Sequence, residues 1–392
     1  MINQILIPNM KSIGYLLTLV ALLFSSCAKE SVVKITIQNQ SDLTRTNEMV
    51  EVDWNLIKDK LRLGKDKTFV LLDDKDQKIP YQIVTNGNKD PKFLIFQVTM
   101  LPQQQLKCKV QAGVPDSISS LVLMEATPQV ITWENEHVAF RLYGGELEMA
   151  PTKDLLEGGF ELWVKRTPHV IAGEWYKDAL AGVRREYRQP GPSGSSFPVG
   201  KTLGAGAASP YQKDTFYYAN VPYSSYEILD NGPLRVVVKL NYKPYYAADS
   251  VLVNETRTIS LDAGSNLNKV IEHYGDIKKE IQVAAGFPYY GNETYVMNGP
   301  EGYLAYAQPE IAEQGTVYLG IVSDVALVDT RVVNDQLIGV MNYRPTYSSG
   351  RGLTYYSGGG WSKDKFPTMQ DWNNYIANYA ARVRHPLIVA VD

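Results

Sequence analysis

Two side chains on one predicted strand could bind and act on an anionic ligand. The alternation of residues 138–142 predicts a strand, and it places Arg141 and Tyr143 on one face of that strand. A guanidinium group pairs with carboxylates, and a tyrosine hydroxyl can transfer a proton. An outer face exposed to solvent would show the same pattern, so both interpretations stay open. We predict that Arg141 binds substrate and that Tyr143 is catalytic.

A histidine on a later strand is the second candidate for proton transfer. His273 lies in the alternating segment 270–274, on the opposite face from Glu272 and Tyr274. Histidine titrates near neutral pH, which suits general acid–base catalysis. A purely structural histidine would fit the same position. We predict that His273 is catalytic.

Cations and aromatic rings are concentrated between residues 165 and 201, in a chain with a formal net charge of −3. Guanidinium and ammonium groups pair with carboxylates or sulfates, and tryptophan offers a flat apolar face for a sugar ring. A charged loop in solvent is the plain alternative. The predicted substrate-binding residues are Arg141, Arg166, Lys201, Trp175 and Trp361.

These residue types favour one reaction over another. β-Elimination at a uronic acid needs a cation at the carboxylate, a base for the C5 proton and an acid for the leaving oxygen. Arginine or lysine, together with tyrosine and histidine, would supply all three. Hydrolysis would need two converging carboxylates, which the sequence alone does not single out. Elimination is therefore the favoured reaction.

Composition excludes some other classes. A formal net charge of −3 does not indicate the basic surface that binds nucleic acid, so we expect no nucleic-acid partner. With four histidines and two cysteines, a zinc site has few ligands available, and we predict no metal site. The sequence identifies no cofactor. Cys108 fits a strand pattern and is predicted to be a small core residue.

The first 27 residues predict export and a lipid anchor. Lys11 precedes an apolar stretch at 13–24, and the small residues Ser25 and Ser26 lead to Cys27. This stretch is shorter than the roughly 20 residues of a membrane-spanning helix, and it is typical of a secretory signal ending at an acylated cysteine. A buried N-terminal strand is the alternative. We expect lipidation at Cys27, with the protein held on the periplasmic face or the surface of the outer membrane.

Short alternating segments with turn residues between them predict a mainly all-β chain. We expect a small β-sandwich over residues 28–122 and a larger β-sandwich over 123–392, which carries the predicted site. One helix is expected near the C-terminus. It begins at Thr368, which with Asp371 resembles a capping box, and it ends before Pro386.

Several phrases of this sequence together resemble one family. They are residues 133–144 (WENEHVAFRLYG), 163–166 (WVKR), 199–206 (VGKTLGAG) and 355–361 (YYSGGGW). They are similar to the family called domain of unknown function 4861. The resemblance implies secreted proteins and lipoproteins of Bacteroidota in polysaccharide-degrading systems. It also implies a large β-supersandwich of the galactose-mutarotase or lyase type. It supplies a context and no mechanism.

The sequence therefore predicts an exported lipoprotein that acts on an acidic, uronic-acid-containing polysaccharide or oligosaccharide, with lyase chemistry favoured over hydrolysis. The alternative is a non-catalytic glycan-binding lipoprotein of a polysaccharide-utilisation system that uses the same groove. A structural envelope protein is the third possibility.

Overall fold

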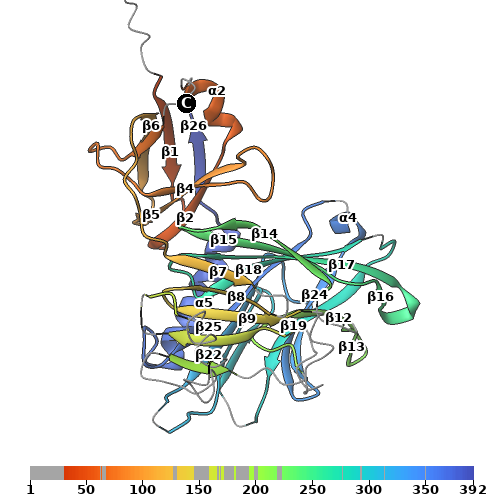
Figure 1. Cartoon of the computed structure of the whole chain (residues 1–392). Coiled ribbons are helices and arrows are strands. Elements are labelled where there is room, and N and C mark those ends of the chain that lie inside the picture. The colour runs from red at the N-terminus through yellow and green to blue at the C-terminus, as the bar shows by residue number, and fades with distance from the viewer. Residues whose placement is uncertain are drawn as a thin grey trace, which may run out of the picture.

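The computed structural model is dominated by strands, which form a small domain and a large domain (Figure 1). Among the residues it describes, no helix is long and apolar enough to cross a bilayer. The structure describes residues 31–61, 63, 68–126, 130–144, 159–165, 167, 169–171, 181, 194–197, 202–218, 223–275, 277–291, 294–312, 314–348 and 350–392.

The small domain is a sandwich of two antiparallel sheets. The four-stranded sheet has the order β26 (Ile388–Val391), β1 (Val33–Gln38), β6 (Gln105–Ala112) and β3 (Phe69–Leu72). The three-stranded sheet has the order β2 (Arg45–Asp53), β5 (Phe93–Met100) and β4 (Tyr81–Val84). Strand β1 alternates, so Val33, Ile35 and Ile37 are fully buried between the sheets. Cys108 lies in the same core, as predicted.

The C-terminal strand belongs to the small domain, which differs from the domain boundary predicted from the sequence. That boundary assigned all of residues 123–392 to the large domain. In the structure β26 pairs with β1 in antiparallel register, with Val389 opposite Ile37. Pairing with β26 satisfies the edge of β1 that would otherwise be open. The small domain is therefore built from both ends of the described chain.

The large domain contains three antiparallel sheets. The first sheet has the order β11 (Gly194–Phe197), β10 (Glu161–Lys165), β9 (Val138–Tyr143), β8 (Val130–Asn135) and β7 (Val122–Ala126). The second has the order β13 (Thr215–Phe216), β12 (Ala208–Gln212), β19 (Ile281–Pro288), β24 (Gln336–Tyr343) and β23 (Asp329–Val333).

The third and largest sheet has nine strands and forms one side of the large domain's core. Its main path runs β14 (Ser225–Asn231), β15 (Arg235–Asn241), β17 (Leu252–Asp262), β18 (Leu267–Gly275), β25 (Leu353–Trp361), β22 (Val317–Ser323), β21 (Tyr303–Ala307) and β20 (Tyr295–Asn298). Strand β16 (Tyr245–Tyr246) pairs with β17 beside this path. A single apolar cluster joins side chains of all three sheets, among them Phe140, Met341 and Ile259. The predicted fold class is confirmed, because the chain is mainly β and a small sandwich precedes a large supersandwich.

The predicted C-terminal helix is present as α5 (Met369–Arg384). The Thr368 side chain accepts a hydrogen bond from the Asp371 backbone N–H, and the Asp371 carboxylate accepts one from Thr368, which completes a capping box. Trp372 and Ile376 are fully buried against the nine-stranded sheet. Within the described ranges there are also two shorter α-helices, α2 (Asn55–Leu61) and α4 (Pro345–Ser348), which are too short for the sequence pattern to have predicted.

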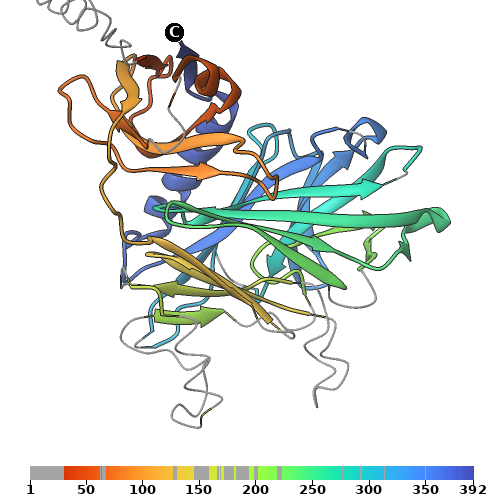
Figure 2. The same cartoon turned by 45° about the horizontal axis from the view of Figure 1, so that its top comes forward.

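Figure 2 shows the small domain lying against one end of the large domain. Hydrogen bonds hold the two domains together. The Gln82 side-chain oxygen accepts from the backbone N–H groups of Leu234 at 2.7 Å and Arg235 at 2.8 Å. The Asp230 carboxylate accepts from the backbone N–H groups of Thr85 and Asn86, at 2.8 and 2.7 Å. These contacts tie the small domain to strands β14 and β15, so the edge of the nine-stranded sheet is held in place.

Candidate functional site

The interior face of the nine-stranded sheet carries charged side chains among apolar ones. Along β17 the alternate residues from Val253 to Leu261 point inward, and this row includes Glu255 and Arg257. On the neighbouring strand β18, Glu272 lies directly opposite Arg257. Glu255, Arg257 and Glu272 are at most 4% exposed. Charged residues this deep are rare unless they are paired or functional.

One guanidinium holds both carboxylates. Arg257 Nε donates to Glu272 Oε1 at 2.6 Å, and Nη2 donates to Glu255 Oε1 at 3.0 Å. The same Nη2 also donates to the Ala208 carbonyl oxygen at 2.9 Å, which joins the second sheet to the cluster. The Tyr245 hydroxyl donates to the other oxygen of Glu255. Both oxygens of Glu255 therefore have hydrogen-bond partners.

Tyrosine hydroxyls surround these charges. The charges and the tyrosines around them form one group, which we call the Glu255–Glu272 cluster. It consists of Glu255, Arg257, Glu272, Tyr242, Tyr245, Tyr274 and Tyr355. Three of its hydroxyls, and one carboxylate oxygen, are buried without a hydrogen-bond partner among the described residues; they belong to Tyr242, Tyr274, Tyr355 and Glu272 Oε2. Buried polar atoms without partners are costly, and native proteins normally satisfy them with protein groups or water. Their convergence marks a buried polar cluster whose unpaired groups could be satisfied by internal water.

Burial sets the protonation states in the cluster. Burial raises the pKa of Glu272, although Arg257 opposes the shift, and the charge of Glu255 raises it further. Burial also raises the pKa of Glu255, against the effects of Arg257 and the Tyr245 hydroxyl. Burial also raises the pKa values of Tyr242, Tyr274 and Tyr355, so their hydroxyls stay protonated and are able to donate. The cluster can thus hold a proton on a carboxyl group near neutral pH.

Arg141 and Tyr143, predicted to share a face, do meet on strand β9, but away from this cluster. Arg141 Nε donates to Glu161 Oε2 at 2.6 Å, and Nη2 donates to the Tyr143 hydroxyl. The guanidinium lies 5.0 Å from the centre of the Trp163 ring. Arg141 is only 1% exposed, on the opposite face from Phe140 of the core. Its charge is already paired within the sheet.

Two other predicted residues do not join the cluster. His273 is half-buried on the outward face of β18, the face opposite Glu272, because successive side chains of a strand point to opposite sides. Burial lowers the pKa of His273, opposed by a hydrogen bond with the Tyr347 backbone. Trp361 is 3% exposed in the core, and its Nε1 donates to the Gln314 carbonyl oxygen at 2.7 Å. Stacking on a sugar needs an open ring face, which Trp361 does not offer.

The remaining predicted residues, Arg166, Lys201, Trp175 and Cys27, lie outside the described residues. The structure also reveals what the sequence reasoning missed. Glu255, Arg257 and Glu272 occupy inward positions of strands whose other inward residues are mostly apolar, and that mismatch is readable from the sequence. Within the described ranges, no three histidine, cysteine or acidic side chains are grouped so as to hold a metal ion.

The family described as "Domain of unknown function (DUF4861)" matches residues 37–389. The chain belongs to this family. Another protein similar to the chain is "Uncharacterized protein P7" of Formosa agariphila, which is 27% identical over 394 residues, covering 95% of this chain and 97% of that protein.

Solved structures show the same architecture at low sequence identity. An α-mannosidase from Enterococcus faecalis V583 aligns with a TM-score of 0.53 and 10% identity over 97% of this chain and 49% of the mannosidase. A glycosyl hydrolase family 38 protein from Enterococcus faecalis gives the same TM-score and identity, over 97% of this chain and 50% of its own. This DUF4861 chain thus spans about half the length of these proteins, and the likeness is one of fold.

Proposed function

We propose that this protein is a carbohydrate-active enzyme whose acid–base chemistry is performed by the Glu255–Glu272 cluster. The observation that carries the proposal is the pairing of two buried carboxylates through one guanidinium, Arg257, beneath tyrosine hydroxyls that have no partner among the described residues. Pairs of carboxyl groups in different environments are the usual acid and base of glycoside hydrolysis. The mannosidase-like fold supports a carbohydrate context for this site.

The hydrogen bonds assign a different role to each carboxyl group. Glu255 accepts from Arg257 on one oxygen and from Tyr245 on the other, which favours its ionised form. Glu272 accepts from Arg257 through Oε1 only, and burial raises its pKa. Burial raises the pKa of both groups, but Glu255 has donors on both oxygens, so Glu272 would be the group that carries the shared proton and serves as general acid, and Glu255 would be the general base or nucleophile. Tyrosine donors would orient the sugar hydroxyls.

The same contacts bear on the choice between hydrolysis and elimination. β-Elimination needs a cation that can neutralise the substrate carboxylate. Arg257 is shared by two carboxylates, and Arg141 is paired with Glu161. The described residues therefore support hydrolysis better than elimination. Elimination at a uronic acid would depend on Arg166 and Lys201. An acidic saccharide stays the proposed substrate class, because the cations between residues 165 and 201 favour an anionic ligand.

Turnover on a panel of uronate-containing and neutral polysaccharides tests the proposal. Hydrolysis releases reducing ends without an unsaturated product, whereas elimination gives a product that absorbs in the ultraviolet. Glu272→Gln and Glu255→Gln should each lower turnover by about 10²- to 10⁴-fold. The matched control is Glu227→Gln on strand β14, where the side chain is exposed and turnover should not change. Unchanged turnover in Glu272→Gln would contradict the assignment. Binding without any turnover by the wild type would indicate a glycan-binding protein.

We also propose that the chain is exported and anchored through a lipid on Cys27, in the outer membrane. The support is the order of charged, apolar and small residues that precedes this cysteine.

A further inference from the structure

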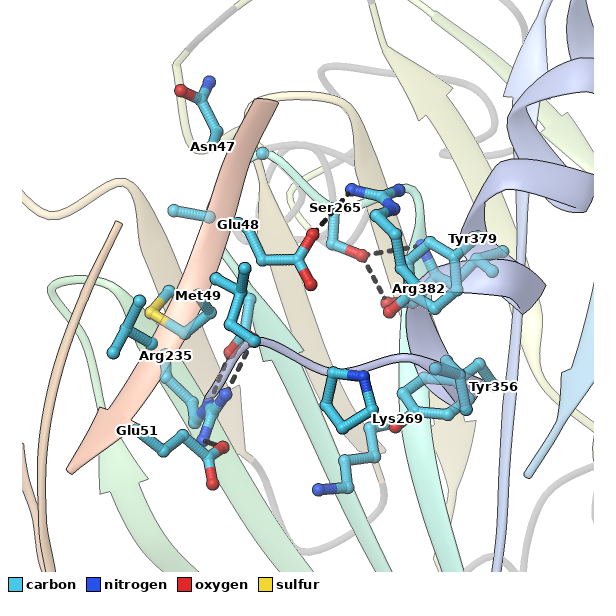
Figure 3. Close-up of a pocket in the computed structure, with 18 of the residues that line it drawn as sticks. Asn47, Glu48, Met49, Glu51, Arg235, Ser265, Lys269, Tyr356, Tyr379 and Arg382 are labelled. Carbon is cyan, nitrogen blue, oxygen red and sulfur yellow. Dashed lines mark hydrogen bonds and ion pairs between the residues drawn. The ribbon is translucent and has the colours of Figure 1, made fainter. Parts of the chain in front are cut away.

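A cavity of about 360 Å³ lies between the small domain and the outer face of the nine-stranded sheet. Strand β2 lines one side, strands β17, β18 and β25 line another, and helix α5 closes a third (Figure 3). Its volume falls within the roughly 300–1,000 Å³ of small-molecule sites, which are often found between domains. It is separate from the Glu255–Glu272 cluster, because Lys269 of this cavity and Glu272 point to opposite faces of β18.

Tyrosine rings form an aromatic wall in the cavity. Tyr356 comes from the sheet, whereas Tyr375 and Tyr379 come from α5. The Tyr356 and Tyr379 ring centres lie 5.2 Å apart at an interplanar angle of 62°, and those of Tyr375 and Tyr379 lie 6.0 Å apart. All three tyrosines are partly exposed. Such rings offer apolar faces to a sugar while their hydroxyl groups remain polar.

The acidic side chains of the cavity are already paired with arginines. Asp262 Oδ2 accepts from Arg235 Nη2 at 2.7 Å, and Glu51 forms an ion pair with the same guanidinium. Glu48 Oε2 lies 3.2 Å from Arg382 Nη1. These pairs neutralise the acids that would otherwise repel an anion.

Two cationic side chains retain donor capacity toward the cavity. Lys269 lines it and makes no hydrogen bond or ion pair within the described part of the chain, and its charge acts at longer range on Glu51 and Asp324. Arg382 uses Nη1 for Glu48 and packs over the Tyr379 ring at 5.0 Å. An ammonium group and a guanidinium edge beside aromatic rings are suited to a sugar that carries a carboxylate.

We propose that this cavity is a second saccharide-binding site, which takes a hexuronate or a short uronate-containing saccharide. Lys269 binds the carboxylate at one end of the cavity, Arg382 donates to a sugar hydroxyl at the other end, and Tyr356 and Tyr379 contact the sugar ring (Figure 3). The ligand class rests on the proposed function, whereas the site itself is independent of the Glu255–Glu272 cluster. The ion pairs of Arg235 and the hydrogen bonds between the domains hold the walls in place, so little ordering is needed when the ligand binds.

Calorimetric titration of the full chain with a hexuronate and its dimer tests this site. We expect binding of the uronates, weaker binding of the matching neutral hexose, and no binding of acetate alone. Lys269→Met should weaken uronate binding at least about tenfold, and Lys269→Arg should restore most of it. Lys239→Met is the matched control, because Lys239 is partly exposed on β15 of the same sheet and does not line the cavity.

The variants separate this proposal from the active-site assignment. The double variant Glu255→Gln and Glu272→Gln should retain uronate binding at the cavity even if turnover is lost. Unchanged affinity in Lys269→Met, or loss of all binding in the glutamine double variant alone, would overturn the second site. Equal affinity for acetate and the uronates would show that the cavity binds a simple anion and no saccharide. A melting temperature close to that of the wild type would verify that Lys269→Met is folded.

Discussion

Glu272 lowers stability at neutral pH, because its carboxyl group ionises freely in the unfolded chain but not in a fully buried site where one oxygen lacks a partner among the described residues. Arg257 offsets only part of that cost, since it also binds Glu255. A residue that lowers stability and still occupies the centre of a polar cluster is typical of an active site, where stability is exchanged for function. The effect of Glu272 on stability and its effect on activity can be measured separately.

We predict that Glu272→Gln raises stability and lowers activity. Burial raises the pKa of Glu272 above its ordinary value of 4.5, so the folded state binds a proton more tightly than the unfolded state. The stability from that protonation is complete below pH 4.5 and is lost as the pH rises through the folded-state pKa. Glutamine does not ionise. The difference in unfolding free energy, variant minus wild type, should therefore grow with pH, by about 1.4 kcal/mol for each unit of pKa shift.

Urea unfolding of both proteins from pH 4 upward measures this difference. Glu227→Gln serves again as the control for the same substitution at an exposed position. A difference that is flat or decreases with pH for Glu272→Gln would contradict the raised pKa.

The same residues show how far the sequence could lead. Alternation correctly placed Arg141 and Tyr143 together, because it is a local property of one strand. It could not reveal Glu161, which is 20 residues away and faces Arg141 across a strand pair. The choice of His273 over Glu272 followed chemical preference, since histidine titrates near neutral pH in water. Burial inside the sheet gives Glu272 a raised pKa, and burial depends on the fold.

At the scale of elements too, sequence patterns predicted features set by neighbouring residues better than contacts between distant ones. The capping box at Thr368 predicted the start of α5, because the two side chains that make it are three residues apart. The partner of β26 is strand β1, about 350 residues earlier, and no short-range pattern specifies that pairing. Strand β26 therefore provides a test of how the small domain depends on the C-terminus.

We predict that Val389→Ser destabilises the small domain and that Ile388→Ser does not. Val389 packs on the small-domain core opposite Ile37, whereas Ile388 points outward and is 47% exposed. Removing a partly buried valine should cost about 1 kcal/mol, and the exposed position should change stability by less than about 0.5 kcal/mol. Hydrogen exchange of the β1 amides measures the effect. Equal protection of β1 in the two variants would argue against the pairing of β26 with this sheet.

At the scale of the whole molecule, the arrangement of the domains bears on where the site would work. Strand β1 begins at Val33, six residues after Cys27. An extended residue spans at most about 3.6 Å, so a lipid on Cys27 would hold the small domain within about 20 Å of the membrane surface. The large domain and its cluster are attached through the fixed contacts of Gln82 and Asp230. The proposed enzyme would then work close to the membrane.

Cys27→Ser should abolish fatty-acid labelling and move the protein from the membrane fraction to the soluble fraction. Turnover should be retained, because residue 27 precedes the first strand of the small domain. Cys108→Ser is the matched control, since Cys108 is 6% exposed in the small-domain core and its replacement should leave labelling intact. Labelling that survives Cys27→Ser, or that disappears with Cys108→Ser in a folded protein, would contradict an anchor at Cys27. In that case the proposed location of the enzyme near the outer membrane would lose its support.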